Sequence, residues 1–528
     1  MRETAARFTD FIQPITFVSP ATRRGLILIA CLVATFMAAI EGTIVATAMP
    51  AIAGDLGGFD QFSGVFTAFL ITQAVSIPIY GRLADMWGRK TVFFIGTGLF
   101  LTGSVLCGMA HGITGLILFR AIQGLGAGAV QPVAATILGD IYTPAERARV
   151  QGLISCVFGV SAVAGPALGA FLTQIVPWPW IFWISLPFGI AAAILIGAFL
   201  SETATPRPRA INATRPGAID ATRPGAIDAP RPGAIDAPRP GAIDAPRPGA
   251  IDAMGAWLML MTAGDLTLAL SGMEDVTPIL LASGLASAGL LWVHERDTPE
   301  PMLPLDLWRR NRVVVVGSLG SCAAGAVFMG VLAFLPAYVT AGMGNTAMAG
   351  GLVIGGLQVS WALASLYAAR LMTRVSYRQV AITGAAALCA GAGLLIVAPP
   401  IPFWTEAAAL CIGTGMGLTI SVFVVSTQAA VTWEERGAAT GSLMFLRFMG
   451  QAAGAAGCGA ILALDGDASL AMNRLMQPAG LLTPETAGRL SIIVADSLHN
   501  AWYLVGVLAF VTLLLASMMP ARINTVTR

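Results

Sequence analysis

The chain has 528 residues, of which 56% are hydrophobic and 11% are charged, and its mean hydropathy is +0.77. Because a soluble domain carries roughly 25% charged residues, this composition indicates an integral membrane protein. The formal net charge is only +2 and the arginines lie between apolar segments, so a nucleic-acid-binding surface is not expected. The seven cysteines show no C-x-x-C spacing, which argues against a disulfide framework or a zinc site.

Runs of about 20 apolar residues predict membrane-spanning helices. Fourteen such runs lie at 26–49, 62–80, 91–110, 114–138, 150–172, 180–200, 255–272, 277–294, 313–340, 347–368, 379–398, 404–428, 437–462 and 499–519. Basic residues concentrate in alternate connections, beginning with Arg23 and Arg24 before the first span. Because cytoplasmic loops are rich in Lys and Arg, we expect an inner (plasma) membrane protein with both termini in the cytoplasm and no cleavable signal.

The first span contains a carboxylate, Glu41, in the run IEGTIV at 40–45. Ionisable groups inside a bilayer are costly, so each is a functional candidate. Burial favours the neutral form of a carboxyl group, which suits a site that binds and releases protons near neutral pH. The structural alternative is a permanently ionised partner of a buried arginine.

The second and third spans are joined by GRLADMWGRK at 81–90, which we interpret as a cytoplasmic hinge loop. Glycine permits a tight turn, an aspartate can meet a positive helix N-terminus, and basic residues hold the loop in the cytoplasm. The candidate hinge residues are Gly81, Arg82, Asp85, Gly88, Arg89 and Lys90. The pattern G-x-L-a-D-x-x-G-R-[KR] resembles the signature loop of the major facilitator superfamily. The resemblance implies an all-α membrane fold of two six-helix bundles that works by alternating access.

The fourth span contains LILFRAIQG at 116–124, which resembles the helix 4 motif of this superfamily, whose arginine is implicated in proton transfer. At 1.5 Å per residue, Arg120 lies ~8–10 Å and Glu41 ~13 Å from the expected outer helix ends, so the two can share a depth. The 40–45 run resembles that of the fourteen-helix drug:proton antiporter family, which usually has Asp at the position of Glu41. The alternative for Arg120 is a side chain that reaches the outer interface.

The fifth span contains GVSAVAGPALGA at 159–170, which resembles the antiporter-associated motif of the superfamily. Glycines let helices approach closely and proline bends a helix axis, so we expect a second hinge surface here. Its residues are Gly159, Gly165, Pro166 and Gly169. We also consider polar side chains within the spans as candidates for the substrate cavity. These are Gln73, Gln123, Gln131, Asp265 and Arg447.

The segment 201–254 contains TRPGAIDA twice and PRPGAIDA three times. Each unit has one Arg and one Asp, and its Pro-Gly pair opposes a regular helix, which predicts an extended or turn-rich linker. We interpret the array as a tandem duplication of the short loop before the next span. A docking or regulatory role is the alternative.

An internal repeat divides the chain. Residues 82–83 (Arg-Leu) recur at 370–371, and the G-x-G-x-G pattern at 124–128 recurs at 413–417, so the offset is 288 or 289. Two related six-helix halves with two inserted helices follow from this offset. The expected divisions are a 1–25 tail, a 26–200 bundle, a 201–254 linker, inserted helices at 255–294, a 295–312 loop, a 313–519 bundle and a 520–528 tail.

The second half lacks the charged pair of the first. At the repeat offset, Glu41 corresponds to Met329, and Arg120 corresponds to Ala408 or Ala409. We therefore expect proton coupling to belong to the first half alone.

The function predicted from these features is proton-coupled export of hydrophobic or amphipathic small molecules, of the multidrug-efflux type. A dedicated exporter of one metabolite, siderophore or lipid is the nearest alternative. A membrane-embedded enzyme is disfavoured, because the three histidines are scattered and no G-x-S-x-G motif occurs. The expected partners are the substrate, protons and the lipid bilayer, with a periplasmic adaptor or outer-membrane channel as a further partner. We expect no cofactor, metal or nucleic acid, and the sequence leaves the oligomeric state open.

Overall fold

The computed structural model describes residues 19–57, 61–142, 144–201, 252–269, 277–298, 303, 305–432, 435–475 and 484–521. These residues form helices and no β-strand. The first group of helices is α2 (Pro20–Leu56), α3 (Phe62–Trp87), α4 (Arg89–Gly108), α5 (Ile113–Ile141), α6 (Pro144–Ile175), α7 (Trp180–Trp183) and α8 (Ser185–Phe199). The second group is α12 (Arg312–Ala337), η2 (Tyr338–Gly342), α13 (Ala347–Leu371), α14 (Tyr377–Val397), α15 (Pro402–Ala429), α16 (Arg436–Leu464), α17 (Gly466–Leu475) and α18 (Pro484–Ser517). Between them lie α9 (Ala253–Ala269), α10 (Thr277–Asp297) and α11 (Leu305–Arg310).

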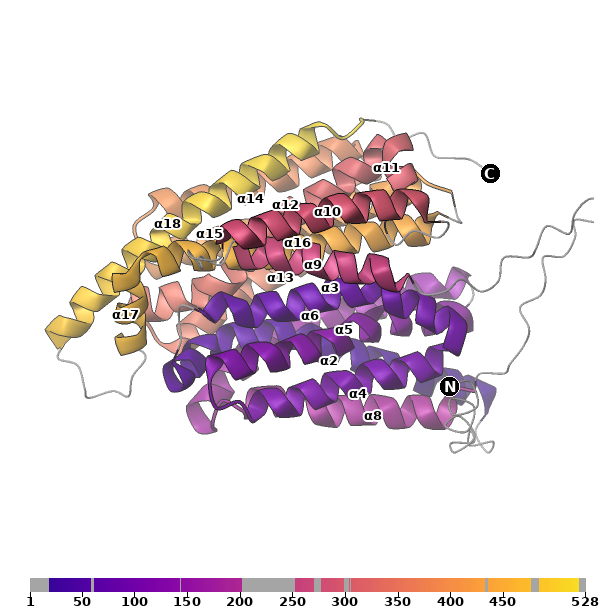
Figure 1. Cartoon of the computed structure of the whole chain (residues 1–528), viewed down its shortest axis with the longest axis horizontal. Coiled ribbons are helices and arrows are strands. Elements are labelled where there is room, and N and C mark those ends of the chain that lie inside the picture. The colour runs from indigo at the N-terminus through magenta and orange to yellow at the C-terminus, as the bar shows by residue number, and fades with distance from the viewer. Residues whose placement is uncertain are drawn as a thin grey trace, which may run out of the picture.

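The two groups of helices form two bundles that lie side by side, with their helix axes roughly parallel (Figure 1). A helix occupies each of the fourteen positions predicted as spans. Twelve helices in the described part of the chain are long and apolar enough to cross a membrane. The other two positions hold α9, with 17 residues, and α16, with 29 residues. An all-α membrane fold is therefore confirmed, whereas fourteen spans stay a prediction.

Three predicted boundaries are wrong. The segment 81–90 is not a loop, because α3 continues to Trp87 and α4 begins at Arg89. Only Gly88, with φ of 90°, interrupts the two helices, and this left-handed backbone is where glycine is needed. The first helix runs on through Pro50 to Leu56. The last helix begins at Pro484 rather than 499, so much of the expected 463–498 loop is helical.

The internal repeat is reproduced by helix packing. A Cβ added to Gly124 of α5 would collide with the Phe69 carbonyl of α3, and one added to Gly413 of α15 would collide with the Leu357 carbonyl of α13. Phe69 and Leu357 differ by 288 positions, and the two glycines differ by 289. The same small residue therefore lets the same pair of helices approach in each half.

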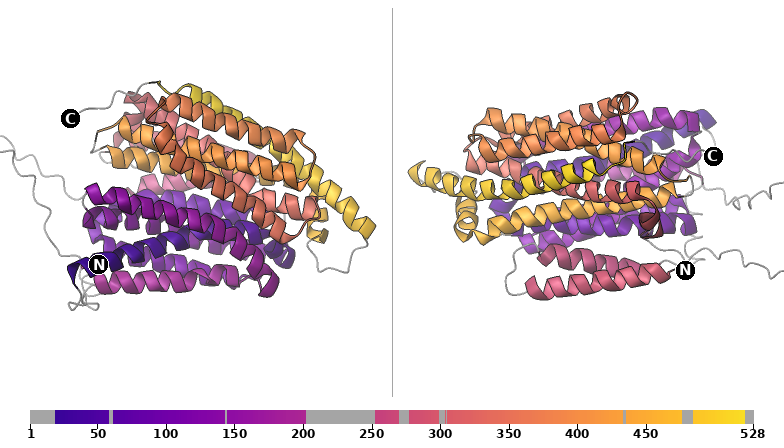
Figure 2. Two further views of the ribbon diagram at one scale, coloured as in Figure 1. Left: turned by 180° about the vertical axis from the view of Figure 1, so that it is seen from behind. Right: turned by 90° about the horizontal axis from the view of Figure 1, so that it is seen from above.

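The inserted helices α9 and α10 form a hairpin on the outside of the bundles (Figure 2, right). The hairpin packs on α3 and α16, one helix from each half. Asp252, the aspartate of the last RPGAIDA copy, precedes α9 and accepts a hydrogen bond from the Gly255 amide at 2.8 Å. Its Oδ1 atom is also 2.7 Å from Nε2 of His294 in α10. The rest of the array lies outside the described residues.

The two halves touch at the end of the bundle opposite Gly88, which we call the far side; the end at Gly88 is the loop side. Phe62 of α3 stacks on Phe334 of α12 with ring centroids 5.2 Å apart. On the other edge of the interface, a Cβ on Gly351 of α13 would press on the Pro166 carbonyl and on Ala170 of α6. The far-side ends are therefore packed together in this structure.

Candidate functional site

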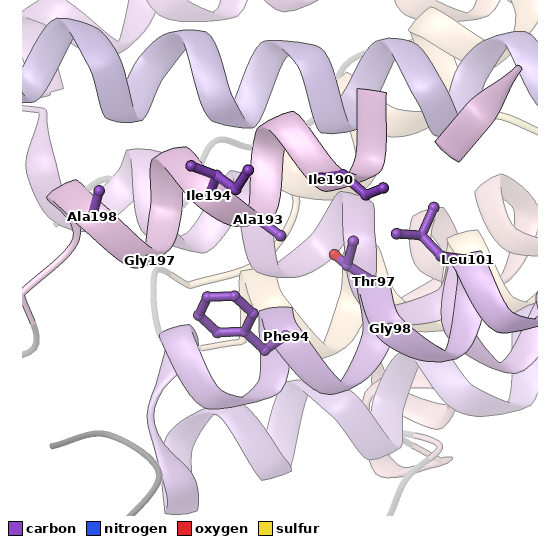
Figure 3. Close-up of a pocket in the computed structure, with 9 residues that line it drawn as sticks. All are labelled: Phe94, Thr97, Gly98, Leu101, Ile190, Ala193, Ile194, Gly197 and Ala198. Atoms are coloured by element: carbon purple, nitrogen blue, oxygen red, sulfur yellow. The ribbon is translucent and has the colours of Figure 1, made fainter. Parts of the chain in front are cut away.

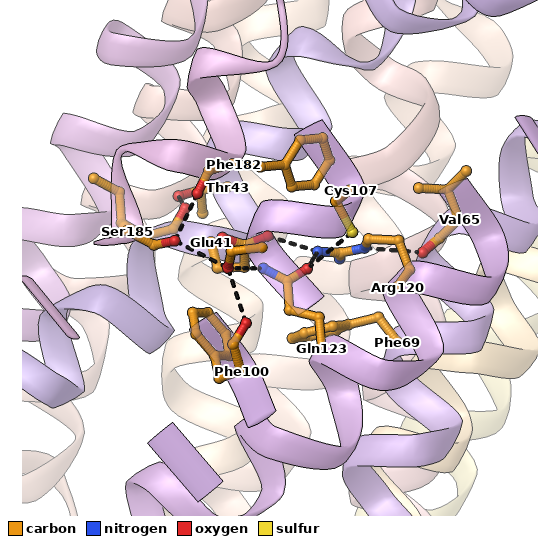
Figure 4. A network of polar contacts seen from close by, with 12 residues as sticks. Glu41, Thr43, Val65, Phe69, Phe100, Cys107, Arg120, Gln123, Phe182 and Ser185 are labelled. Atoms are coloured by element: carbon orange, nitrogen blue, oxygen red, sulfur yellow. Dashed lines mark hydrogen bonds and ion pairs between the residues drawn. The ribbon is translucent and has the colours of Figure 1, made fainter. Parts of the chain in front are cut away.

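Glu41 of α2 and Arg120 of α5 form an ion pair inside the first bundle (Figure 4). The Nη1 atom of Arg120 is 2.6 Å from Oε1 of Glu41, and each side chain is only 1% exposed. Arg120 therefore does not reach the outer interface. Desolvation offsets much of the attraction within a buried ion pair, so the contact is weak evidence for a role in stability. It does join a carboxyl group on one helix to a cation on another.

Arg120 is fixed from three sides. Its Nη1 atom donates to Oε1 of Gln123 at 2.6 Å, and its Nε atom donates to the Val65 carbonyl of α3 at 3.3 Å. Its guanidinium also lies over the Phe69 ring, 4.1 Å from the centroid. Such contacts hold the cation in place whether or not the carboxyl group of Glu41 is ionised.

Gln123 extends the polar network to two more helices. Its Nε2 atom donates to the Ser104 hydroxyl of α4 at 2.8 Å, and Ser104 donates to the Phe100 carbonyl at 3.0 Å. The Ser185 hydroxyl of α8 lies 3.1 Å from the Ser104 hydroxyl. Neither serine was a sequence candidate, because a hydroxyl in an apolar span usually bonds its own helix and carries little signal.

The equivalent positions of the second half are apolar. By the repeat offset, Glu41, Ser104, Arg120 and Gln123 correspond to Met329, Ala392, Ala409 and Ile412. All four counterparts are buried. At these positions the charged and polar groups occur in the first half alone, and proton coupling by the first half stays a prediction.

The hinge candidate at 81–90 is part of a polar end on the loop side. Nε of Arg89 lies 3.0 Å from Oδ2 of Asp140 at the end of α5. Nζ of Lys90 donates to the Gly197 carbonyl of α8 at 2.8 Å. These contacts tie the start of α4 to its neighbours in the same bundle.

Other members of that candidate are less informative. Gly81 lies within α3, and a Cβ there would meet open space, so packing does not require glycine. The side chains of Arg82 and Asp85 lie outside the described residues. The contact expected between Asp85 and a helix N-terminus stays a prediction.

Two glycines of α6 pack on residues of α2 that are close to Glu41 in sequence. A Cβ on Gly165 would collide with Thr43 of α2, and one on Gly169 would press on the Ile44 carbonyl. Thr43 and Ile44 follow Glu41 in the same helix. The α6 motif therefore contacts the segment of α2 that carries the carboxylate. Gly159 makes only an ordinary contact with α13.

The three glutamine candidates lie in different environments. Gln123 is fully buried in the ion-pair network, so it does not line an accessible cavity in this structure, contrary to expectation. Gln131 lies on the same face of α5 as Arg120, eleven residues and about three turns further on, and is partly buried. Gln73 of α3 is 6% exposed and does not join the network.

Asp265 and Arg447 also lie apart from the ion pair. Oδ2 of Asp265 accepts a hydrogen bond from the Ser283 hydroxyl at 2.6 Å, which joins α9 to α10 within the inserted hairpin. Arg447 of α16 packs its backbone and side-chain stem on Gly325 of α12. One carboxylate was missed: Glu406 of α15 lies against Gly356 of α13. The sequence does indicate Glu406, because it is the one acidic residue in the apolar run 404–428.

Concave surfaces also occur away from the network. An apolar groove of about 400 Å³ lies between α4 and α8 and is lined by Phe94, Thr97, Gly98, Leu101, Ile190, Ala193, Ile194, Gly197 and Ala198 (Figure 3). A more polar pocket of about 250 Å³ lies on the loop side near α11. Within the described residues, no group of three or more His, Cys, Asp or Glu is arranged to hold a metal ion.

Known proteins resemble this chain in sequence and in fold. Residues 31–455 match the family model of the Major Facilitator Superfamily. The multidrug transporter protein MdtP of Bacillus subtilis is 30% identical over 451 residues, which cover 84% of this chain and 76% of MdtP. Multidrug resistance protein 3 of the same organism is 28% identical over 430 residues, or 81% of this chain and 77% of that protein.

A bacterial homologue of the human lysosomal transporter Spinster, in an inward-facing and occupied conformation, has a similar fold. The TM-score is 0.61 at 15% identity, with 95% of this chain and 97% of that chain covered. Together with the paired bundles and the internal repeat, the family match shows that this chain belongs to the major facilitator superfamily. It is therefore a membrane transporter and not an enzyme, and its relatives include multidrug transporters.

Proposed function

We propose that this transporter is a proton-coupled antiporter that exports hydrophobic or amphipathic small molecules by alternating access. The observation that carries the proposal is the buried contact between Glu41 and Arg120. The names of the relatives, a multidrug transporter and a multidrug resistance protein, support efflux as the direction of transport. We place the protein in the plasma membrane with the loop side in the cytoplasm.

Proton binding at Glu41 changes the forces between α2 and α5. The ionised carboxylate attracts Arg120, and protonation removes that attraction while Arg120 stays bound to Gln123 and Val65. The contact that loosens is therefore the one to α2. Because Gly165 packs on Thr43, a movement of α2 also involves α6.

The hinge candidates lie at two places in the structure that alternating access would involve. The α6 motif lies between α2 and the other half, since Pro166 faces Gly351 across the interface. Gly88 and the contacts of Arg89 and Lys90 lie at the loop side, where the halves separate when that side opens. We propose that both segments bias the equilibrium between the two access states and do not bind substrate.

The central experiment compares Glu41→Gln with the wild type in everted membrane vesicles. A side-chain amide does not bind and release a proton near neutral pH, so Glu41→Gln should abolish dye efflux driven by a proton gradient while substrate binding to the purified protein persists. Glu41→Asp should keep substantial transport, because the carboxyl group remains. Glu406→Gln is the matched control, since it removes another carboxylate from a span and leaves the network intact.

Substrate-induced proton release by the purified protein provides the second measurement. Release should disappear in Glu41→Gln and persist in Glu406→Gln. Unchanged release in Glu41→Gln would show that another group carries the proton, and Asp265→Asn would then be the next variant to measure. Competition by a panel of unrelated dyes distinguishes multidrug export from export of one metabolite, siderophore or lipid, which would leave most of the panel without effect.

A further inference from the structure

Four polar side chains of the spans have no polar partner among the described residues. Gln73 of α3, Gln358 of α13 and Gln451 of α16 are 6%, 6% and 5% exposed, and their amides make no hydrogen bond there. Arg447 of α16 forms no ion pair in the same part of the chain, and its Nε atom is buried without a hydrogen-bond partner. The buried Nε atom of Arg447 is costly to leave without a partner, and the three amides can still form hydrogen bonds, so a molecule outside the chain that bonds these groups would gain binding energy.

Gln73 points toward the second half. It lies eleven residues after Phe62 and seven after Phe66, so the three share one face of α3. Phe62 stacks on Phe334 of α12, which fixes the direction of that face. The amide of Gln73 is therefore on the surface that the first half turns toward the second.

Gln358 lies on the surface that the second half turns toward the first. It lies seven residues after Gly351 and four before Ala362, on the same face of α13. Gly351 contacts Pro166 of α6, and Ala362 faces Gly159 of α6 across an ordinary contact distance. Gln358 thus lies between two points at which the second half meets the first.

Gln451 lies between the sides of α16 that contact α12 and α3. Its neighbour Ala452 accepts a hydrogen bond from Thr67 of α3 at 3.5 Å, and its other neighbour, Gly450, packs on the backbone of Cys322 in α12. Arg447 lies one turn earlier on the same face as Gln451. The two side chains therefore share one face of α16, and the guanidinium carbon of Arg447 lies 5.3 Å from the centroid of the Phe448 ring.

Two of these four polar residues have aromatic counterparts at the equivalent positions of the other half. Arg447 corresponds to Phe158 of α6 at an offset of 289, and Gln73 corresponds to Trp361 of α13 at 288. Phe158 is 43% exposed and Val160 is 59% exposed. The two lie about 160° apart around α6, so they are on opposite sides of the helix. At these two pairs of positions one half therefore has an aromatic ring where the other has a polar group, whereas Gln358 and Gln451 correspond to the apolar Leu70 and Ala162.

The two membrane arginines differ in charge balance. Arg120 is paired with Glu41 at 2.6 Å, whereas Arg447 makes no contact with a carboxylate in the described residues. Glutamine amides are neutral and leave that charge in place. An uncompensated guanidinium attracts an anion, and carboxylates or sulfonates match its planar row of donors.

We propose that Arg447, Gln451, Gln73 and Gln358 form the recognition site for an amphipathic anion, a compound with a carboxylate or sulfonate on an apolar body. The inference rests on the proposed export function and specifies its substrate class. Arg447 binds the anionic group, the three amides donate to its oxygens, and Phe158 and Trp361 contact the apolar body. Glu41 and Arg120 keep their separate role in proton coupling.

The test uses three fluorescent probes that share one apolar body: 1-pyrenebutyrate, its methyl ester and 1-pyrenebutylamine. Binding of each to the purified full chain is measured at fixed pH without a gradient. Wild type should bind the carboxylate most tightly. Arg447→Gln should weaken carboxylate binding about tenfold or more and change ester and amine binding by less than about threefold, since only the charge-assisted contact is lost.

Two variants complete the comparison. Arg447→Lys keeps the charge and should recover part of the carboxylate affinity, whereas Arg489→Gln, a surface change in α18, should leave all three affinities unchanged. The proposal is overturned if Arg447→Gln weakens the three probes equally, if it weakens none, or if wild type does not prefer the carboxylate. Charge-selective binding together with gradient-independent efflux would instead reject proton coupling and leave this site standing.

Discussion

At the scale of single residues, the first bundle concentrates its buried charge at one point. Arg120 contacts α2, α3 and a side chain of its own helix, and Gln123 continues the chain of hydrogen bonds to Ser104. Removing one member of such a network leaves another buried group unpaired, which costs more than the lost bond itself. The positions in this network are therefore expected to respond to substitution together and not additively.

Arg120→Ala should move the pH optimum of transport upward if activity survives. Without the guanidinium, the buried carboxyl group of Glu41 keeps its proton to a higher pH, so deprotonation and the next cycle require a more alkaline medium. Arg120→Lys retains the cation and should shift the optimum less. Efflux rates between pH 5.5 and 9 measure both effects; an optimum that stays in place in Arg120→Ala would contradict electrostatic coupling of the pair.

At the scale of helices, close approach through glycine determines which helices can pack together. A Cβ on Gly450 of α16 would overlap the carbonyl of Cys322 in α12, and one on Gly454 would overlap that of Ala326. Backbone atoms cannot turn aside as a flexible side chain can. The α12 and α16 pair is therefore held at a spacing that only glycine at these positions allows.

Gly450→Ala should destabilise the protein although alanine is the better helix former. The gain in helix propensity is up to about 1 kcal/mol, whereas forcing a methyl group into a packed interface costs about 1–3 kcal/mol. Gly441→Ala in the same helix is the matched control, because a Cβ there meets nothing within 4 Å. Thermal unfolding of the purified variants should show a lower Tm for Gly450→Ala only; equal Tm values would contradict the packing argument.

The inserted hairpin contacts one residue of the repeat array. Asp252 caps α9 and contacts His294, so Asp252→Ala should cost the hairpin about 0.5–2 kcal/mol.

Deleting 214–245, four whole units, keeps the last copy and should leave transport within about twofold of wild type, since linkers tolerate changes in length.

Efflux and thermal unfolding of both variants distinguish the cap from the linker. A deletion that inserts normally but fails to transport would assign a function to the array itself. Full stability of Asp252→Ala would show that the cap is dispensable.

At the scale of the whole molecule, the structure is closed on the far side. Phe62 meets Phe334 on one edge of the interface, and Gly351 meets Ala170 on the other. A transporter that alternates access must break these contacts to open toward the far side. Their strength therefore sets part of the equilibrium between the two access states.

Gly351→Val should shift that equilibrium toward far-side opening, because the added side chain presses on Ala170 and the Pro166 carbonyl. Gly355→Val, one turn further along α13, has open space at its Cβ and serves as the control. A Ser63→Cys probe, packed on Gly459 across the interface, reports the opening through its rate of maleimide labelling. Labelling should be faster with Gly351→Val than with Gly355→Val, and equal rates would reject the closure.

The sequence determined the class of protein, the positions of the helices and the division into two halves. Hydropathy and charge patterns depend on local composition, so they are found without a structure. The repeat offset is found by comparing the two parts of the sequence. The sequence also selected Glu41 and Arg120, because ionisable groups stand out in apolar runs. The sequence predicted the ends of the helices less well. At 81–87, for example, no residue pattern distinguishes a loop from the continuation of the helix that the structure contains.

Only the tertiary structure decided which polar groups have partners. Gln123 and Gln73 are the same residue type in similar apolar runs, yet one is bonded to Arg120 and the other makes no bond among the described residues. Likewise Arg120 has a carboxylate at 2.6 Å and Arg447 has none in that part of the chain. Glu41, the partner of Arg120, lies on α2, and Ser104, a further partner of Gln123, lies on α4, so these pairings depend on how the helices are packed, which the sequence of one span does not contain.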